Sequence, residues 1–234
     1  MAKTKTSCIV IGYHQTPYSV HLTMACLANI RKYTAGDYEL ILIEDIPKFK
    51  VRDDYGALAL DKHIILDEYT NYTKKMNLAA AEASGEYIVF IQNDCFVWEG
   101  WLPVVEYYFD KGMSRCLIPD QLPRTRGYML DSYAMTMEEG LNHPLAHAED
   151  CMVAITKEAF KKIGGWNEYL RALVMRDFYE RCLRAKVNVD KTNKIQVTHI
   201  TLGTHYQDMD EFDKKLHHDS QILNHGVPPD DVKE

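Results

Sequence analysis

The feature that most constrains this chain is the alternation of short apolar runs with helix-length segments in its first half. The apolar runs are Cys8–Ile11, Glu39–Ile43, His63–Leu66 and Glu86–Ile91. Between them, residues 18–33 carry apolar side chains at helical spacing, and residues 72–83 are rich in strong helix formers. Strands separated by helices of this length predict βαβ units and a parallel, mostly buried sheet.

The second half is less regular. Its pattern predicts strands at Cys151–Ile155 and Val197–Ile200, and helices at 157–163 and 176–186. Residues 119–149 are rich in Pro, Arg, Tyr and His with weak periodicity, which predicts a long loop of the kind that is usually functional or mobile. A length of 234 residues suits one α/β domain, so we expect a single domain over 1–234.

Composition excludes several classes of protein. Hydrophobic residues make up 46% and charged residues 26%, which is typical of a soluble globular chain and unlike disordered, collagen-like or coiled-coil sequences. The net charge of −7 disfavours a module that grips a nucleic-acid backbone. The six cysteines form no CxxC pair, and no apolar run is long enough for a signal peptide or a membrane span. We therefore expect buried free thiols, no integral membrane segment and a cytoplasmic location.

Polar clusters follow three of the predicted strands: Gly12-Tyr13-His14, Glu44-Asp45 and Gln92-Asn93-Asp94. Turns after strands are commonly polar, but in an open parallel sheet ligands bind beyond the carboxyl ends of the strands. Together the clusters predict one crevice. Neither GxGxxG nor GxxxxGK[ST] occurs, so a bound nucleotide would need a metal ion to carry its diphosphate charge. Asp94 is the best candidate metal ligand, with an Asx turn as the structural alternative.

Several stretches resemble, in the right order, the family 2 glycosyltransferases of the GT-A fold. The longest is Gly85-Glu86-Tyr87-Ile88-Val89-Phe90-Ile91-Gln92-Asn93-Asp94, followed by Gly100-Trp101-Leu102. The others are Ile9–His14, Tyr38–Asp45, Asn77, Gly164-Gly165-Trp166-Asn167-Glu168, and Arg176-Asp177 through Arg184. The resemblance spans residues 7–200 and implies a mixed, mainly parallel sheet flanked by helices. It also implies a nucleotide-sugar-binding half at 7–110, an acceptor half at 111–209, and a C-terminal helix and tail at 210–234.

The same resemblance implies an inverting, metal-dependent glycosyltransferase that uses a nucleotide-sugar, most simply a UDP-sugar. Asp45 is then expected to bind the base, Asp94 to hold Mn²⁺ or Mg²⁺ on the diphosphate, and Asp177 to act as the general base. A late histidine often joins the metal in GT-A enzymes, which points to His199 or His205, with a structural histidine as the alternative. The remaining residues expected to contact the donor are Tyr13, Lys75, Asn77 and Asn93.

The sequence also departs from the family pattern. Gln92 replaces the first acid of the metal motif, Arg176 replaces the acid before the expected base, and Met76 stands where an arginine is common. Lys74 or Lys75 is expected to replace the contact of that arginine with the diphosphate. Trp166 is either an acceptor-stacking ring or a buried aromatic.

Two acceptors remain open, a glycan and a hydroxymethylated DNA base. The second occurs in bacteriophage enzymes, for which the location would be the host cytoplasm. Two alternatives to a glycosyltransferase also stand. One is a GT-A-like nucleotidyltransferase, which usually carries a glycine-rich loop that is missing here. The other is a non-catalytic sugar-nucleotide-binding protein, which the replacements at Gln92 and Arg176 would allow.

Overall fold

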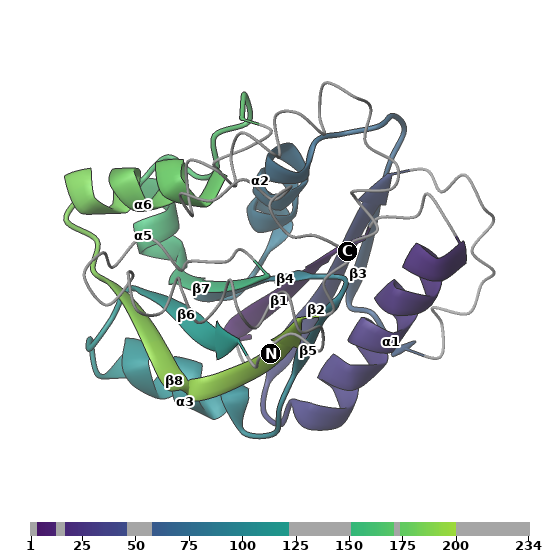
Figure 1. Ribbon diagram of the computed structural model, residues 1–234, viewed down its shortest axis with the longest axis horizontal. Helices are drawn as coiled ribbons and strands as arrows, with labels where there is room; N and C mark the ends of the chain where they lie inside the picture. The colour runs from purple at the N-terminus through teal and green to yellow at the C-terminus, as the bar shows by residue number, and fades with distance from the viewer. Residues whose placement is uncertain (1–3, 13–16, 46–57, 122–150, 171–173, 200–234) are drawn as a thin grey trace, which may run out of the picture.

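The computed structural model describes residues 4–12, 17–45, 58–121, 151–170 and 174–199 (Figure 1). The first half contains the predicted alternation of strands and helices: β1 (Thr6–Ile11), α1 (Pro17–Tyr33), β2 (Tyr38–Asp45), β3 (Lys62–Leu66), α2 (Tyr72–Glu82) and β4 (Tyr87–Gln92). The second half contains β5 (Cys95–Val97), α3 (Trp101–Asp110), β6 (Cys116–Gln121), β7 (Met152–Thr156), α5 (Lys157–Lys162), α6 (Val174–Arg184) and β8 (Val189–His199).

The strands form one eight-stranded sheet in the order β3-β2-β1-β4-β7-β6-β8-β5. The pairs β2–β3, β1–β2, β1–β4 and β6–β8 are parallel, whereas β4–β7, β6–β7 and β5–β8 are antiparallel. The sheet is therefore mixed and mainly parallel, as expected. Because β1 lies between β2 and β4, the carboxyl ends of these three parallel strands meet at one edge of the sheet.

Helices cover both faces of the sheet. Figure 1 shows α2, α5 and α6 on one face and α1 and α3 on the other. The first face buries apolar residues such as Ile41, Phe90 and Met76, and the second buries residues such as Leu42, Leu27 and Trp101. Successive strand residues alternate between the two cores, so β1, β2 and β4 are buried on both faces.

Three elements were not predicted from the sequence. Helix α3 (Trp101–Asp110) and the short strand β5 (Cys95–Val97) follow the metal motif, and β6 (Cys116–Gln121) includes residues 119–121, which the sequence assigned to a loop. The last predicted strand is also too short, because β8 begins at Val189. The rest of the expected 119–149 loop, Ile200 and the 210–234 tail lie outside the described residues.

All six cysteines are buried and free, as predicted. Within the described part of the chain, no helix has both the length and the apolar character needed to cross a bilayer.

Candidate active site

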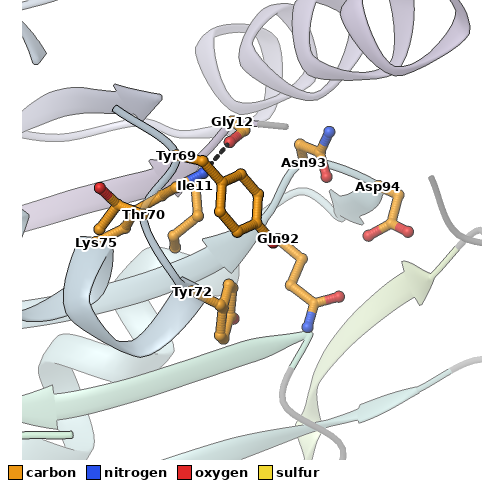
Figure 2. A pocket seen from close by; sticks show the side chains of 9 residues that line it. All are labelled: Ile11, Gly12, Tyr69, Thr70, Tyr72, Lys75, Gln92, Asn93 and Asp94. Carbon is orange, nitrogen blue, oxygen red and sulfur yellow. Dashed lines mark hydrogen bonds between the residues drawn. The ribbon is translucent and has the colours of Figure 1, made fainter. Parts of the chain in front are cut away.

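A pocket opens beyond the carboxyl ends of β1 and β4, where the sequence predicted a crevice. Figure 2 shows the nine side chains that line it, which are Ile11, Gly12, Tyr69, Thr70, Tyr72, Lys75, Gln92, Asn93 and Asp94. The strand ends supply one wall. The other wall comes from the connection between β3 and α2 and from the first turn of that helix.

Asp94 lies in the turn between β4 and β5, and its side chain is buried. Strand β5 pairs antiparallel with β8 so that Cys95 lies opposite His199. This register brings the imidazole Nε2 of His199 to 3.2 Å from the Asp94 Oδ1. The two residues predicted to bind a metal are therefore adjacent in space, although they lie far apart in the sequence.

The Asp94–His199 pair has the chemistry of a partial metal site. Asp94 Oδ1 is shielded from solvent and accepts no hydrogen bond within the described residues, so this buried carboxylate oxygen is suited to a cation. A carboxylate and an imidazole are ligands that Mn²⁺ accepts. Among the described residues, no group of three or more His, Cys, Asp or Glu side chains is placed to hold a metal. A cation here would need further oxygen ligands from a bound molecule.

Asn93 and Gln92 complete the β4 side of the pocket. The Asn93 Nδ2 donates a hydrogen bond of 3.0 Å to Thr23 Oγ1 of α1, and the side chain is almost wholly buried. The amide is therefore held by α1. Gln92 lies at the last position of β4, and its side chain is half-buried.

Asp45 and Lys75 form a buried ion pair at the end of β2. Lys75 Nζ lies 2.5 Å from Asp45 Oδ2 and donates a hydrogen bond of 3.3 Å to the carbonyl of Gly12. Asp45 Oδ1 accepts a hydrogen bond of 2.9 Å from the backbone N–H of Thr70. Burial lowers the pKa of Lys75 below the ordinary value, and the charge of Asp45 opposes that shift. Asp45 itself does not line the pocket; it lies behind Thr70 and Lys75, which do.

Asn77 lies on α2 with its amide turned toward the turn at 164–168. Its Oδ1 accepts a hydrogen bond of 2.8 Å from Trp166 N, and its Nδ2 donates to Trp166 O at 2.9 Å and to Glu168 Oε1 at 2.8 Å. Gly165 has a φ of +72°, and a Cβ added there would lie 2.8 Å from Asn77 Oδ1. Asn77 thus fixes this turn, and it is not among the residues that line the pocket.

Asp177 lies in the first turn of α6 and is held from two sides. Its Oδ2 accepts a hydrogen bond of 2.8 Å from Arg181 Nε and lies 2.7 Å from Arg181 Nη2. Its Oδ1 has a longer contact of 3.5 Å with Asn167 Nδ2. Arg181 also donates to the backbone carbonyls of Ile163 and Gly165. The Asp177–Arg181 pair therefore links α6 to the turn that Asn77 holds.

Trp166 is buried rather than open to an acceptor. Its ring stacks on Phe178 with centroids 4.2 Å apart and meets Phe90 edge-on at 5.5 Å. Of the two readings that the sequence allowed, the structure supports the buried aromatic. Tyr13, His14 and His205 lie outside the described residues.

Sequence reasoning missed the wall formed by Tyr69, Thr70 and Tyr72. A signal was present, because Tyr69 and Thr70 follow a predicted strand and precede a predicted helix, of which Tyr72 is the first residue. Asn71 caps that helix by accepting a hydrogen bond of 2.8 Å from Lys74 N.

The chain is similar to known proteins in both sequence and structure. The sequence model described as Glycosyl transferase family 2 matches residues 8–164, which is more than half of the chain. The matched segment includes both walls of the pocket and ends at the turn held by Asn77. A search of curated proteins gave no significant match.

Three solved structures illustrate the structural likeness. The mannosyltransferase PcManGT from Pyrobaculum calidifontis, in complex with GDP-Man and Mn²⁺, superposes with a TM-score of 0.67 at 14% identity over 86% of this chain. S. aureus TarS 1-349 in complex with UDP-GlcNAc superposes with a TM-score of 0.66 at 15% identity over 88% of this chain. GalNAc-T7 with UDP, GalNAc and Mn²⁺ superposes with a TM-score of 0.63 at 15% identity over 85% of this chain. This chain spans 58%, 61% and 44% of those three chains, respectively. At such low identity the likeness shows the fold alone.

Proposed function

The chain belongs to glycosyl transferase family 2, and from this we propose that it transfers a sugar from a nucleotide-sugar donor to a hydroxyl group of an acceptor. The expected GT-A fold is confirmed by the mixed, mainly parallel sheet and by the structural likenesses. The observation that carries the proposal is the pocket at the strand ends, with Asp94 and His199 paired beside it.

We place the diphosphate of the donor at the Asp94–His199 side of the pocket. A bound Mn²⁺ or Mg²⁺ would be held there by these two side chains and would supply positive charge to the diphosphate. Lys75 lies over the end of β1 and lines the same pocket, so its ammonium is placed to add a second positive charge. Both similar structures that contain Mn²⁺ also contain a nucleotide or a nucleotide-sugar, which is consistent with this arrangement.

The nucleoside would then lie toward Asp45, at the end of β2. A buried carboxylate with additional lone pairs can accept the N–H of uracil, which supports UDP as the nucleotide. Two of the similar structures contain UDP or UDP-GlcNAc, and one contains GDP-Man. The test must therefore include both nucleotides.

We assign the role of general base to Asp177, in a single displacement that inverts the anomeric centre. Its two oxygens differ, since Oδ2 is held by Arg181 and Oδ1 has only the long contact with Asn167. Oδ1 is therefore the oxygen that we propose takes a proton from an acceptor hydroxyl. Arg181 would fix the orientation of the carboxylate.

The proposed acceptor is a hydroxyl of a glycan or of a hydroxymethylated DNA base. The net charge of −7 favours the glycan, because a DNA-binding surface is usually basic. One panel tests the whole proposal: UDP- and GDP-sugars with Mn²⁺ or Mg²⁺, each incubated alone, with oligosaccharides, and with hydroxymethylated DNA. Sugar transfer to either acceptor supports the proposal and identifies the acceptor.

The same panel separates the alternatives. Tight binding of nucleotide-sugars with no transfer or hydrolysis under any condition would support a non-catalytic binding protein. Formation of a nucleotide-sugar from a nucleoside triphosphate and a sugar 1-phosphate would support a nucleotidyltransferase. Either result would overturn the assignment of glycosyl transfer.

A further inference from the structure

Tyr69 is an exposed aromatic side chain on the wall of the pocket. It lies in the connection between β3 and α2, and 67% of its surface is exposed. Figure 2 shows its ring standing in front of the strand ends, with the Asp94 carboxylate away to the right. A single exposed aromatic is ordinary on a protein surface, but an aromatic that lines a ligand pocket offers a flat apolar face to whatever binds there.

The backbone on either side of Tyr69 is well anchored. The next residue, Thr70, donates its N–H to Asp45 Oδ1 at 2.9 Å, and its hydroxyl donates to the Glu68 carbonyl at 3.1 Å. One residue further on, Asn71 caps α2. The Cα of Tyr69 is thus held relative to both β2 and α2, so binding would need to order only the side-chain torsions of Tyr69.

The position of Tyr69 relative to Asp94 fits the length of a nucleoside diphosphate. Neighbouring strands lie roughly 4.8 Å apart, so the ends of β4 and β2, with β1 between them, are separated by about 10 Å. Asp94 follows β4, and Asp45 ends β2 beside Thr70. A donor whose diphosphate lies near Asp94 would therefore extend its nucleoside toward Asp45 and Tyr69.

We propose that the Tyr69 ring stacks on the nucleobase of the donor and holds the nucleoside end of the pocket. This inference rests on the proposed function, because it takes the ligand to be a nucleotide-sugar. Stacking is tolerant of base identity, since every base has a π-face, whereas a hydrogen bond to Asp45 depends on the edge of the base. Tyr69 would thus contribute affinity for any nucleotide, and Asp45 would contribute the choice among them.

The test compares Tyr69→Leu and Tyr69→Phe with the parent by calorimetric titration with uridine, UMP, UDP and GDP. Stacking on an aromatic ring contributes about 1–3 kcal/mol per base. Tyr69→Leu should therefore lower the affinity for all four ligands by a similar factor, roughly 5- to 150-fold. Phe keeps the ring and should bind nearly as the parent does. Tyr107→Leu is the matched control, since Tyr107 is 54% exposed on α3, far from the pocket, and this change should alter nothing.

A second readout does not depend on measured affinities. In the parent, stacking should shift the H5 and H6 resonances of bound uridine upfield through the ring current of Tyr69, and Tyr69→Leu should abolish the shift. The inference is overturned if Tyr69→Leu binds uridine as the parent does, or if it weakens only ligands that carry a diphosphate. If the parent binds none of the four ligands, the proposed function itself fails, and the two failures are thereby distinguished.

Discussion

His199 Nε2 lies 3.2 Å from Asp94 Oδ1, at the point where the last described strand passes the end of the metal motif. The antiparallel register of β5 and β8 sets this contact, because Cys95 lies directly opposite His199. The proposed metal site, with these two residues as ligands, would depend on a short edge strand of three residues. Its geometry is therefore a property of the sheet and not of a local loop.

The first prediction is that Asp94→Asn removes metal-dependent donor binding. The carboxylate charge is lost while the shape is kept, so UDP affinity in the presence of Mn²⁺ should fall by at least about tenfold and approach the affinity measured without metal. Calorimetric titration of UDP with and without Mn²⁺ measures this. The control Glu99→Gln removes an exposed carboxylate nearby and should bind like the parent. Unchanged Mn²⁺-dependent affinity in Asp94→Asn would refute the metal assignment.

The second prediction concerns the Asp45–Lys75 ion pair. Removing one partner of a buried pair leaves an uncompensated charge, so Asp45→Ala and Lys75→Met should each lower the free energy of unfolding by about 3–5 kcal/mol. The double variant should lose clearly less than the sum, since it leaves no lone charge. Urea unfolding of the parent, the two single variants and the double variant gives the four free energies of this double-mutant cycle. Additive losses would show that the two charges are not coupled.

The third prediction is a pH dependence of nucleotide binding through Lys75. Burial lowers the pKa of its ammonium below the ordinary 10.5, so as pH rises the proton is lost earlier than from a free lysine. UDP affinity measured without metal should therefore decline with a midpoint below 10.5. Between the folded and unfolded pKa values the unfolded chain binds more protons, so stability should rise with pH across the same window. In Lys75→Met the UDP affinity should not decline over this pH range. A decline that persists in this variant would be due to the titration of another group.

The fold was largely predictable because its central strands are strongly patterned. Strands β1, β2 and β4 are buried on both faces, and so they stand out as apolar runs in the sequence. Strand β8 does not, since its residues include Lys191, Asn193 and Lys194, which are exposed. Its extent is set by pairing with β6 and β5, which are distant in sequence, and no local pattern reports such pairing.

The site was predictable to the extent that strand ends define it. Asp94 and His199 follow from the family pattern and are adjacent in the structure. The orientation of Asn77 could not be foreseen, because its amide is fixed by the backbone of a turn far along the chain. The roles of Asp94 and His199, and those of Asp45, Lys75, Asn77, Asn93 and Asp177, all remain predictions.

The fourth prediction is that Gly165→Ala is more destabilising than Gly112→Ala. Gly165 has a φ of +72°, and the new Cβ would lie 2.8 Å from Asn77 Oδ1. The left-handed backbone alone costs about 1–2 kcal/mol, and the clash adds to it. Gly112→Ala is the matched control, because its φ is +63° and nothing lies within 4 Å of the new Cβ. Equal losses in thermal or urea unfolding would show that Asn77 does not hold this turn tightly.

The fifth prediction concerns Asp177 as the general base. Asp177→Asn keeps the size of the side chain but removes the basic oxygen, so donor and metal should bind as in the parent while transfer slows by about 10²–10⁴-fold. Single-turnover transfer assays together with donor titration separate the two steps. The structure adds a second explanation for a slow variant, since Asp177 also anchors Arg181 and through it the turn at 163–165.

Arg181→Gln distinguishes these explanations. It breaks the same ion pair but leaves the Asp177 carboxylate in place, so a purely structural role predicts that both variants lose activity and stability alike. A catalytic role predicts that Arg181→Gln, which keeps the basic oxygen, slows transfer much less than Asp177→Asn does at a similar free energy of unfolding. If Asp177→Asn transfers sugar at nearly the parental rate, the carboxylate serves only to hold α6, and Glu168 and Glu180 become the next candidates for the base. Glu168 accepts a hydrogen bond from Asn77, and Glu180 pairs with Arg184 on the exposed side of the helix, so Glu168 would be tested first.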